Sequence, residues 1–300
     1  KKIIKVANYV YILFAFLQLY FPSIINIFLY TRTKNNFFGG RGLSSLTPEP
    51  FHFGAILILF SIIILIKSEY NIRKDLLIHV INLISIFTIA RSATLILVLV
   101  FSSILSLILN ISNVIRNANN IQNLRYIFLL GIVFTICIFY SIQYDTRIFS
   151  IISTLIDGNF KENFITLLNS DRSISGRLEH LIIPFLAFYK DFGLPHAFNG
   201  MIESSEIINP EFGIFLNSQA QEKFMSFMGD YVFSLGIFGI IAAFLLLLPL
   251  ILKNKVPNYI LITFITLLTT SVPVSTPLVP AVLAGFYYAN NSSINYNKYY

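Results

Sequence analysis

The sequence has few charged residues and almost no cysteine. Charged residues make up 12% of its 300 positions, whereas 56% are hydrophobic. A soluble domain carries about 25% charged residues, so this chain has too little polar surface to cover a globule in water. A lipid bilayer is the solvent that suits such a composition. The one cysteine, Cys137, excludes a disulfide within the chain, and we expect it to pack as a small hydrophobic residue.

Several motifs of soluble enzymes are also missing. The sequence has no phosphate-binding P-loop, no dinucleotide glycine fingerprint and no zinc-ligand spacing. No Asp-x-Asp pair or carboxylate cluster suggests a divalent metal. These absences argue against a nucleotide-sugar glycosyltransferase and a metal-dependent enzyme, and we expect neither metal nor cofactor. A net charge of +7 would suit nucleic acid, but Lys and Arg cluster in short loops between apolar runs, which is typical of membrane topology.

Long apolar runs dominate what is present. Because about 17–25 apolar residues can cross a bilayer, we predict an all-α, polytopic transmembrane helical bundle of about seven or eight spans. The expected spans are 6–30 with a kink at Pro22, 51–66, 76–89, 93–111, 126–142, 225–252, the span beginning at 259–271, and 273–289. The last is broken by prolines and either crosses or re-enters the membrane.

Positive charge in alternate short loops sets the expected orientation. By this rule the turns at 67–74, 116–125 and 253–255 face the cytoplasm, and the opposite side holds eleven of the fourteen Asp and Glu residues within 145–230. We therefore divide the chain into N-terminal spans (1–142) with a short periplasmic loop at 31–50, a large periplasmic loop with short helices (143–228), and C-terminal spans (229–300). Because the chain begins at Lys1 rather than Met, we expect further helices upstream.

Arginines on the outer side are candidates for chemistry, because positive charge normally favours the inner side. Arg91 lies in a turn between two apolar runs, where it either snorkels to the headgroups or binds an anion. Arg41 is flanked by glycines that let backbone approach a ligand, and its guanidinium can grip a phosphate. Glu49, between two prolines at a span's start, is either a general base or a carboxylate that satisfies the helix N-terminus.

A second group of candidates lies in the large loop. Arg172 and Arg177 flank small residues before a predicted helix at 177–192, with Ser173 and Ser175 as expected N-caps and a stop at Gly193. A helix N-terminus favours anions, and His180 lies three residues after Arg177, on the same helix face. These side chains either bind an anion or form a solvated ion cluster with neighbouring acids.

The order of these features resembles that of Wzy-type O-antigen polymerases, over roughly residues 31–245. Four elements carry the resemblance: the run 37–42 leading into Pro48-Glu49-Pro50, like a Gly-Arg…Glu-Pro signature; Arg91-Ser92, like a Ser-Arg turn; Ser175-Gly176-Arg177, like a large-loop arginine motif; and Gly236-Ile237-Phe238-Gly239, like a Gly-x-x-Gly element. The related ligases carry a histidine near the end of the large loop, and 226–231 here has none, which favours a polymerase.

The resemblance implies a multi-pass glycosyltransferase of the bacterial inner (cytoplasmic) membrane, with its active site facing the periplasm. It would polymerise undecaprenyl-diphosphate-linked oligosaccharide repeat units for O-antigen or another surface polysaccharide, in the lipid bilayer and with a chain-length regulator protein as partner. Arg41, Arg91, Arg172 and Arg177 would bind the diphosphate. Glu49, or else His180, would be the catalytic base. The alternatives are an O-antigen or protein-glycan ligase using the same donor, and a polysaccharide flippase or transporter.

Overall fold

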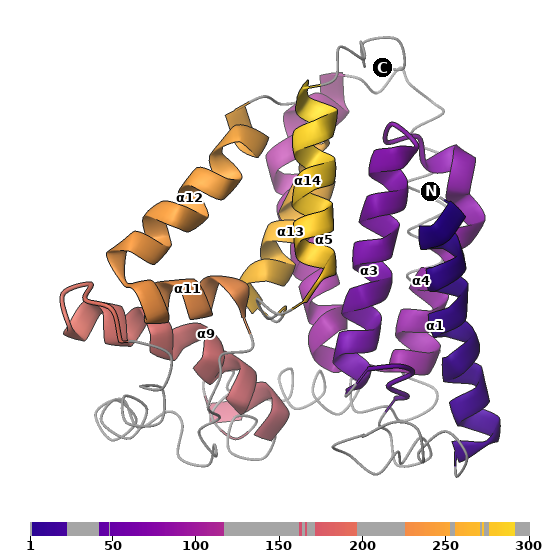
Figure 1. Ribbon diagram of the computed structural model, residues 1–300, viewed down its shortest axis with the longest axis horizontal. Coiled ribbons are helices and arrows are strands. Elements are labelled where there is room, and N and C mark those ends of the chain that lie inside the picture. Colours follow the sequence, from indigo (N-terminus) through magenta and orange to yellow (C-terminus); the bar gives the residue numbers. More distant parts are fainter. Residues whose placement is uncertain are drawn as a thin grey trace. The chain divides into compact units, whose positions relative to one another are not determined.

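The computed structural model describes residues 2–22, 42–47, 49–116, 162–163, 166, 172–196, 226–252, 256–270, 272 and 276–291. Every regular element in these ranges is helical, which confirms the all-α prediction for the described part of the chain (Figure 1). In chain order they are α1 (Lys2–Tyr20), α3 (Pro50–Lys67), η2 (Ile72–Asp75), α4 (Leu76–Ser85), the π-helical turn η3 (Ile86–Ala90), α5 (Ala93–Arg116), α9 (Arg172–Lys190), α11 (Phe227–Leu235), α12 (Ile237–Leu252), α13 (Asn258–Thr270) and α14 (Leu278–Asn291).

Two of these helices, α1 and α3, are long and apolar enough to cross a membrane, judged by length and composition. Shorter apolar helices lie within α12, α13 and α14. The predicted total of seven or eight spans stays a prediction, and the expected span 126–142 lies outside the described residues.

Prolines lie at several helix ends. Helix α1 stops at Tyr20, directly before the Phe21–Pro22 pair, because proline restricts the residue before it. The sequence predicted a kink at Pro22 within a span 6–30, of which residues 23–30 lie outside the described residues. Helix α3 begins at Pro50, where the missing N–H costs nothing. Helix α14 begins at Leu278 and carries Pro280 in its first turn, so the expected break precedes it.

The prediction of one continuous span over 225–252 is wrong, because the segment folds as two helices. Helix α11 ends at Leu235, and α12 begins at Ile237. Between them Gly236 adopts φ 56° and ψ −132°, a conformation open in practice only to glycine. A side chain there would also lie 2.2 Å from the carbonyl oxygen of Gly193.

The described residues form two compact units, each considered by itself. Unit 1 comprises Lys1–Ser150, Pro257–Thr263 and Pro280–Tyr300, and unit 2 comprises Ile151–Val256 and Phe264–Val279. The expected site residues are distributed over both units.

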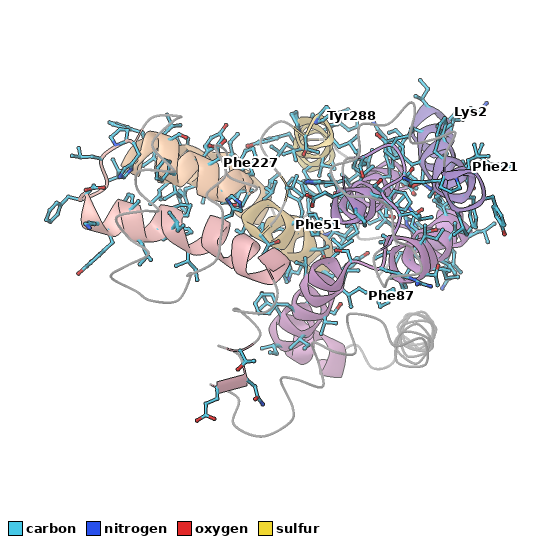
Figure 2. All side chains as sticks on the ribbon, turned by 90° about the horizontal axis from the view of Figure 1, so that it is seen from below. Lys2, Phe21, Phe51, Phe87, Phe227 and Tyr288 are labelled. Atoms are coloured by element: carbon cyan, nitrogen blue, oxygen red, sulfur yellow. The ribbon has the colours of Figure 1, made fainter. Side chains whose placement is uncertain are left out.

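In unit 1, α1 packs on α3 and α4 through a face that carries polar residues. Its buried positions are Asn8, Ile12, Ala15 and Gln18, which recur every three or four residues along one helix face. Asn8 Nδ2 donates to Asn82 Oδ1 at 2.8 Å, and Asn82 Nδ2 donates to Ser61 Oγ at 2.8 Å. The opposite face of α1 exposes large apolar side chains: Ile3, Val6, Tyr9, Leu13, Phe16 and Tyr20. At the end of this helix Phe21 points away from unit 1 (Figure 2).

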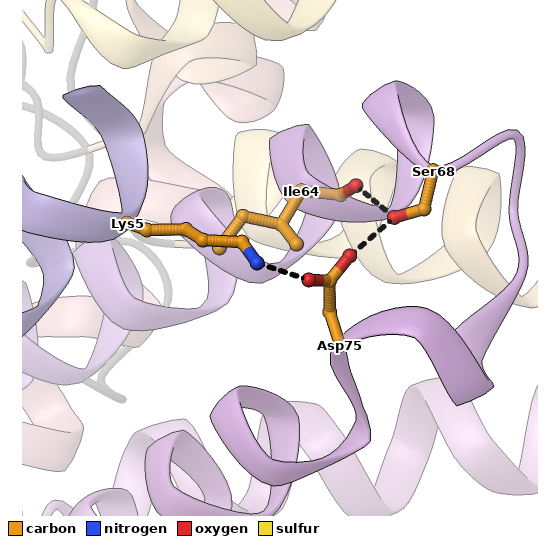
Figure 3. Close-up of polar contacts among 4 residues, drawn as sticks. All are labelled: Lys5, Ile64, Ser68 and Asp75. Atoms are coloured by element: carbon orange, nitrogen blue, oxygen red, sulfur yellow. Dashed lines mark hydrogen bonds and ion pairs between the residues drawn. The ribbon is translucent and has the colours of Figure 1, made fainter. Parts of the chain in front are cut away.

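A buried ion pair holds the start of α1 against the α3–α4 connection (Figure 3). Lys5 Nζ pairs with Oδ1 of Asp75, whose side chain is fully buried. Ser68 Oγ lies 2.8 Å from the other carboxylate oxygen and also within hydrogen-bond distance of the Ile64 carbonyl, so its one proton is shared between these two acceptors. Because both carboxylate oxygens have partners, the burial of this charge is compensated.

In unit 2, α9, α11 and α12 pack closely. The core is formed by Ile183, Ala187 and Phe233. Ser226 is the N-cap of α11, and its Oγ accepts a hydrogen bond from Gly229 N at 3.0 Å. Gly239 lies against the backbone of Tyr231, since a Cβ there would be 1.8 Å from the Tyr231 carbonyl oxygen. Because Gly239 has no side chain, α12 can pack closely against α11.

Candidate functional site

The first turns of α3 and α5 meet at one end of unit 1. A Cβ placed on Gly54, in the second turn of α3, would lie 2.2 Å from Cδ2 of Leu95 in the first turn of α5. It would also lie 3.6 Å from the Cβ of Ala90, the last residue of η3. Both helices therefore direct the positive end of their dipoles to the same region (Figure 1). We call this region the α3–α5 end and include in it residues 42–47, Glu49, η3 and Arg91.

The segment 42–47 is fixed to η3 by a very close backbone contact. A Cβ on Gly42 would lie 1.8 Å from the carbonyl oxygen of Ala90, so no other residue fits without a backbone shift. The next residue, Leu43, donates its N–H to the carbonyl of Ile89 at 2.8 Å. The glycine that follows Arg41 and the turn that holds Arg91, separate motifs in the sequence, are thus in contact. Arg41 itself lies outside the described residues.

Arg91 has an unusual backbone at this end. It adopts φ 44° and ψ 35°, the left-handed region, and its N–H donates to Ile86 O at 3.1 Å to close the π-helical turn. Its Nε donates to Thr88 O at 3.0 Å, and the side chain is half-buried. A non-glycine residue in this region costs about 1–2 kcal/mol. Such backbone strain and π-helical turns both occur frequently at functional sites.

Glu49 is the N-cap residue of α3, and its contacts with the helix are made by its backbone. It is extended, with φ −143° and ψ 151°, and its carbonyl accepts hydrogen bonds from Phe53 N at 3.2 Å and Thr47 Oγ1 at 2.8 Å. Its half-buried carboxylate makes no capping hydrogen bond to the helix. The capping hydrogen bond expected in the alternative interpretation is therefore not formed, and an interaction of this carboxylate with the dipole of α3 stays a prediction.

Sequence reasoning missed the buried polar residues that support this end. Gln18, near the end of α1, donates from Nε2 to Ser44 Oγ at 3.3 Å and accepts from Ser45 N at 2.9 Å. Thr47 Oγ1 lies 2.6 Å from Ser44 O, and its one proton is shared between this carbonyl and that of Glu49. All four side chains are buried. A glutamine inside an expected span was the available signal, because intramembrane polar residues usually have partners.

The other candidates lie in unit 2, on one helix. Helix α9 begins at Arg172, five residues before the predicted start, so the two serines expected as N-caps lie inside it. The helix ends at Lys190, and Gly193 follows in the left-handed region with φ 79°, as the expected stop.

His180 lies in the packed interior of unit 2. It is 3% exposed, its carbonyl accepts a hydrogen bond from Ser226 Oγ at 3.4 Å, and a Cβ on Gly229 would lie 2.9 Å from that carbonyl oxygen. Such burial gives His180 little access to a sugar hydroxyl and favours Glu49 as the base. Nothing about the side chains of Arg172 and Arg177 is described beyond their place on α9.

The described residues contain no group of three or more His, Cys, Asp or Glu side chains that could hold a metal ion. Comparisons of the chain with protein-family models, with curated proteins and with solved structures found no match. The function therefore has to be argued from the residues and their geometry.

Proposed function

We propose that this chain is an integral protein of a bacterial inner membrane that polymerises undecaprenyl-diphosphate-linked oligosaccharide repeat units at the periplasmic face. The observation that carries the proposal is the α3–α5 end, where two helix N-termini converge beside Arg91. A membrane location and an anion site are separate parts of the proposal and have separate support.

The distribution of polarity in α1 supports the membrane location. Only 22% of its apolar window is buried, compared with 72% for α3. A helix of a soluble protein would turn its apolar face inward. Helix α1 buries Asn8 and Gln18 beside Ile12 and Ala15, and it exposes larger apolar residues such as Leu13 and Phe16. This arrangement suits lipid, where polar side chains must find partners inside the protein and apolar ones face outward.

The positive character of the α3–α5 end supports binding of a diphosphate. Each helix N-terminus carries roughly half a positive charge. Arg91 adds a full charge two residues before α5 begins, and its Nε is already held by Thr88. Helix N-termini and arginine are the groups that most often bind phosphate in proteins. Arg41, one residue before the Gly42 contact, would add a second guanidinium.

The proposed reaction needs these groups at one place. A hydroxyl oxygen of the acceptor unit attacks the anomeric carbon of the growing chain, and the bond from that carbon to the diphosphate oxygen breaks. The electron pair leaves with undecaprenyl diphosphate, whose negative charge Arg41 and Arg91 would stabilise. The hydroxyl proton passes to a base, for which Glu49 at the start of α3 is the candidate. The donor is already activated, so no nucleotide is required.

Replacing Arg91 by glycine tests the site, because it separates charge from backbone. Glycine accepts the left-handed conformation without cost, so the variant should fold and insert while losing the guanidinium. We expect Arg91→Gly to abolish the lipopolysaccharide ladder in a strain that makes the cognate repeat unit but lacks its polymerase. Arg73→Gly, an exposed arginine beyond the opposite end of α3, should keep the ladder. An intact ladder in Arg91→Gly, with insertion verified, would refute this site.

The same donor chemistry would serve a ligase, so the acceptor must be tested directly. Purified protein would be incubated with lipid-linked repeat units alone, and separately with lipid A core or an acceptor protein. A polymerase lengthens the lipid-linked chain in the first reaction. Transfer to the second type of acceptor without any lengthening would mean that the chain is a ligase.

A further inference from the structure

Helix α9 has two different apolar faces, of which only one is covered. Ile183 and Ala187 are buried and pack against Phe233 of α11. On another side of the helix, Phe185, Tyr189 and Phe192 are 47%, 82% and 95% exposed. The first two are four residues apart and so share a face of the helix, and the third follows in the turn after it. We call these three residues the aromatic stripe.

The aromatic stripe is continuous with the exposed apolar start of α12. Gly193, the residue after Phe192, accepts a hydrogen bond from Ile237 N at 2.9 Å. A Cβ on Gly236 would lie 2.8 Å from the carbonyl carbon of Leu194. Leu194, Ile237 and Phe238 are all exposed around this contact. Further along α12 the exposed residues are again apolar: Ile240, Ile241, Phe244 and Leu245.

Three backbone N–H groups of the turn at the end of α9 are hydrogen-bonded within the protein. The N–H groups of Asp191 and Gly193 donate to the carbonyls of Ala187 at 2.9 Å and Phe188 at 2.8 Å. The N–H of Leu194 donates to Asp191 O at 3.1 Å. Asp191 also pairs with the ring of His196. These bonds lower the cost of moving this part of the turn into a less polar layer.

We propose that the aromatic stripe and Leu194 insert into the boundary between the headgroups and acyl chains of a bilayer, so that the end of α9 anchors unit 2 to the membrane surface. Aromatic side chains concentrate at this boundary. Exposed Lys190, beside Tyr189, can reach the lipid phosphates while its stem stays in the apolar layer. The exposed neighbours Leu194, Ile237 and Phe238 are apolar. A glycan site would need more polar side chains around the rings than those of Lys190 and Asp191. The inference rests on the proposed membrane location but not on the polymerase activity.

Tryptophan fluorescence tests this directly, because the chain contains no tryptophan. Phe192→Trp gives the full chain a single reporter, reconstituted in phosphatidylcholine vesicles whose acyl chains carry bromine near the headgroup or near the chain end. Interfacial helices bury their apolar face about 5–10 Å deep. We expect blue-shifted emission and a larger loss of intensity with shallow bromine than with deep bromine. Tyr189→Trp should behave in the same way.

Phe244→Trp on α12 is the matched control for membrane location. It should be quenched most by deep bromine. In one outcome, bromine quenches Phe244→Trp but not Phe192→Trp, and iodide in the water quenches Phe192→Trp. That result would refute the anchor and leave the membrane location standing. If neither reporter responds to bromine, both ideas fail. Emission of Phe192→Trp that changes only with added oligosaccharide, or only with protein density, would assign the stripe to a glycan or to a second copy of the chain and refute the anchor.

Discussion

The contact between Gly42 and Ala90 gives the sharpest prediction, because it links the two motifs of the α3–α5 end. In Gly42→Ala the new Cβ would lie 1.8 Å from the Ala90 carbonyl oxygen and 2.6 Å from that of Ile89. Ordinary contact begins near 3.4 Å, so the two backbones must separate by about 1.6 Å. Both atoms in conflict belong to the main chain, and no side-chain rotation can relieve it.

The expected loss of stability follows from that shift. A separation of this size breaks the 2.8 Å hydrogen bond from Leu43 N to Ile89 O. Leaving such a buried group unsatisfied costs about 1–3 kcal/mol, and forcing extra volume into a packed site costs about 1–3 kcal/mol. Alanine restricts the unfolded chain and returns about 0.4–1 kcal/mol. We expect a net loss of roughly 1–6 kcal/mol in the free energy of unfolding.

Gly285→Ala is the matched control within unit 1. A Cβ on Gly285, inside α14, would lie 3.2 Å from Cδ1 of Ile66, the flexible end of a side chain. Replacing a helical glycine by alanine gains up to about 1 kcal/mol. In detergent, followed by circular dichroism, Gly42→Ala should therefore melt at a lower temperature than the original chain. Gly285→Ala should melt at the same or a higher temperature.

The polymerisation assay gives the second half of this test. Because Gly42 follows Arg41 and contacts the turn of Arg91, the Gly42→Ala shift should also remove the lipopolysaccharide ladder, even at a temperature where the protein stays folded. Gly285→Ala should keep the ladder. Equal melting temperatures and two intact ladders would mean that the close contact does not exist in the native protein, and the reasoning about the α3–α5 end would be refuted.

Three further predictions concern buried polar groups. Lys5→Met leaves the carboxylate of Asp75 buried without its cation and should cost roughly 3–5 kcal/mol; adding Asp75→Asn should restore most of the melting temperature, and no restoration would contradict the pairing. Gln18→Leu removes the acceptor of Ser45 N and should cost about 1–3 kcal/mol, seen as faster hydrogen exchange at the Ser45 amide; unchanged exchange would argue against this contact. Ser226→Ala removes the N-cap of α11 and should lower the free energy of unfolding by about 1 kcal/mol; an unchanged midpoint in denaturant would show that the cap contributes nothing.

Helix ends set by local chemistry were predictable from the sequence. The start of α3 at Pro50 and the stop of α9 before Gly193 both depend on residues at the end itself. At Pro22 the prediction was a kink within a longer span, and α1 ends at Tyr20. Proline and glycine restrict or release the backbone wherever they occur, so no knowledge of the rest of the fold is required.

Features that depend on distant partners were not predictable. A glycine in an apolar run is compatible with a continuous helix, and Gly236 breaks one because its backbone lies against Gly193. The buried position of His180 follows from the packing of α9 on α11, which its spacing from Arg177 does not reveal. The π-helical turn η3 likewise has no sequence signature.

The candidate site was likewise predictable only in part. The types of residue, arginine beside glycine and a glutamate beside proline, were visible in the sequence. The sequence did not show that these residues meet in space. Gly42 and Ala90 are far apart in the chain, and they come into contact only because Gly42 has no side chain. Gln18 was overlooked because its partners, Ser44 and Ser45, lie in a segment that has no regular structure.

The backbone of Arg91 connects this packing to the proposed function. The left-handed conformation costs an arginine about 1–2 kcal/mol, and glycine at the same place would remove that cost. The surrounding hydrogen bonds impose this conformation: Leu43 N donates to Ile89 O, and Arg91 N donates to Ile86 O. An arginine in so unfavourable a position is hard to explain by stability alone. It is explained if the guanidinium is needed beside the N-termini of α3 and α5, where a lipid-linked diphosphate would meet three sources of positive charge at once.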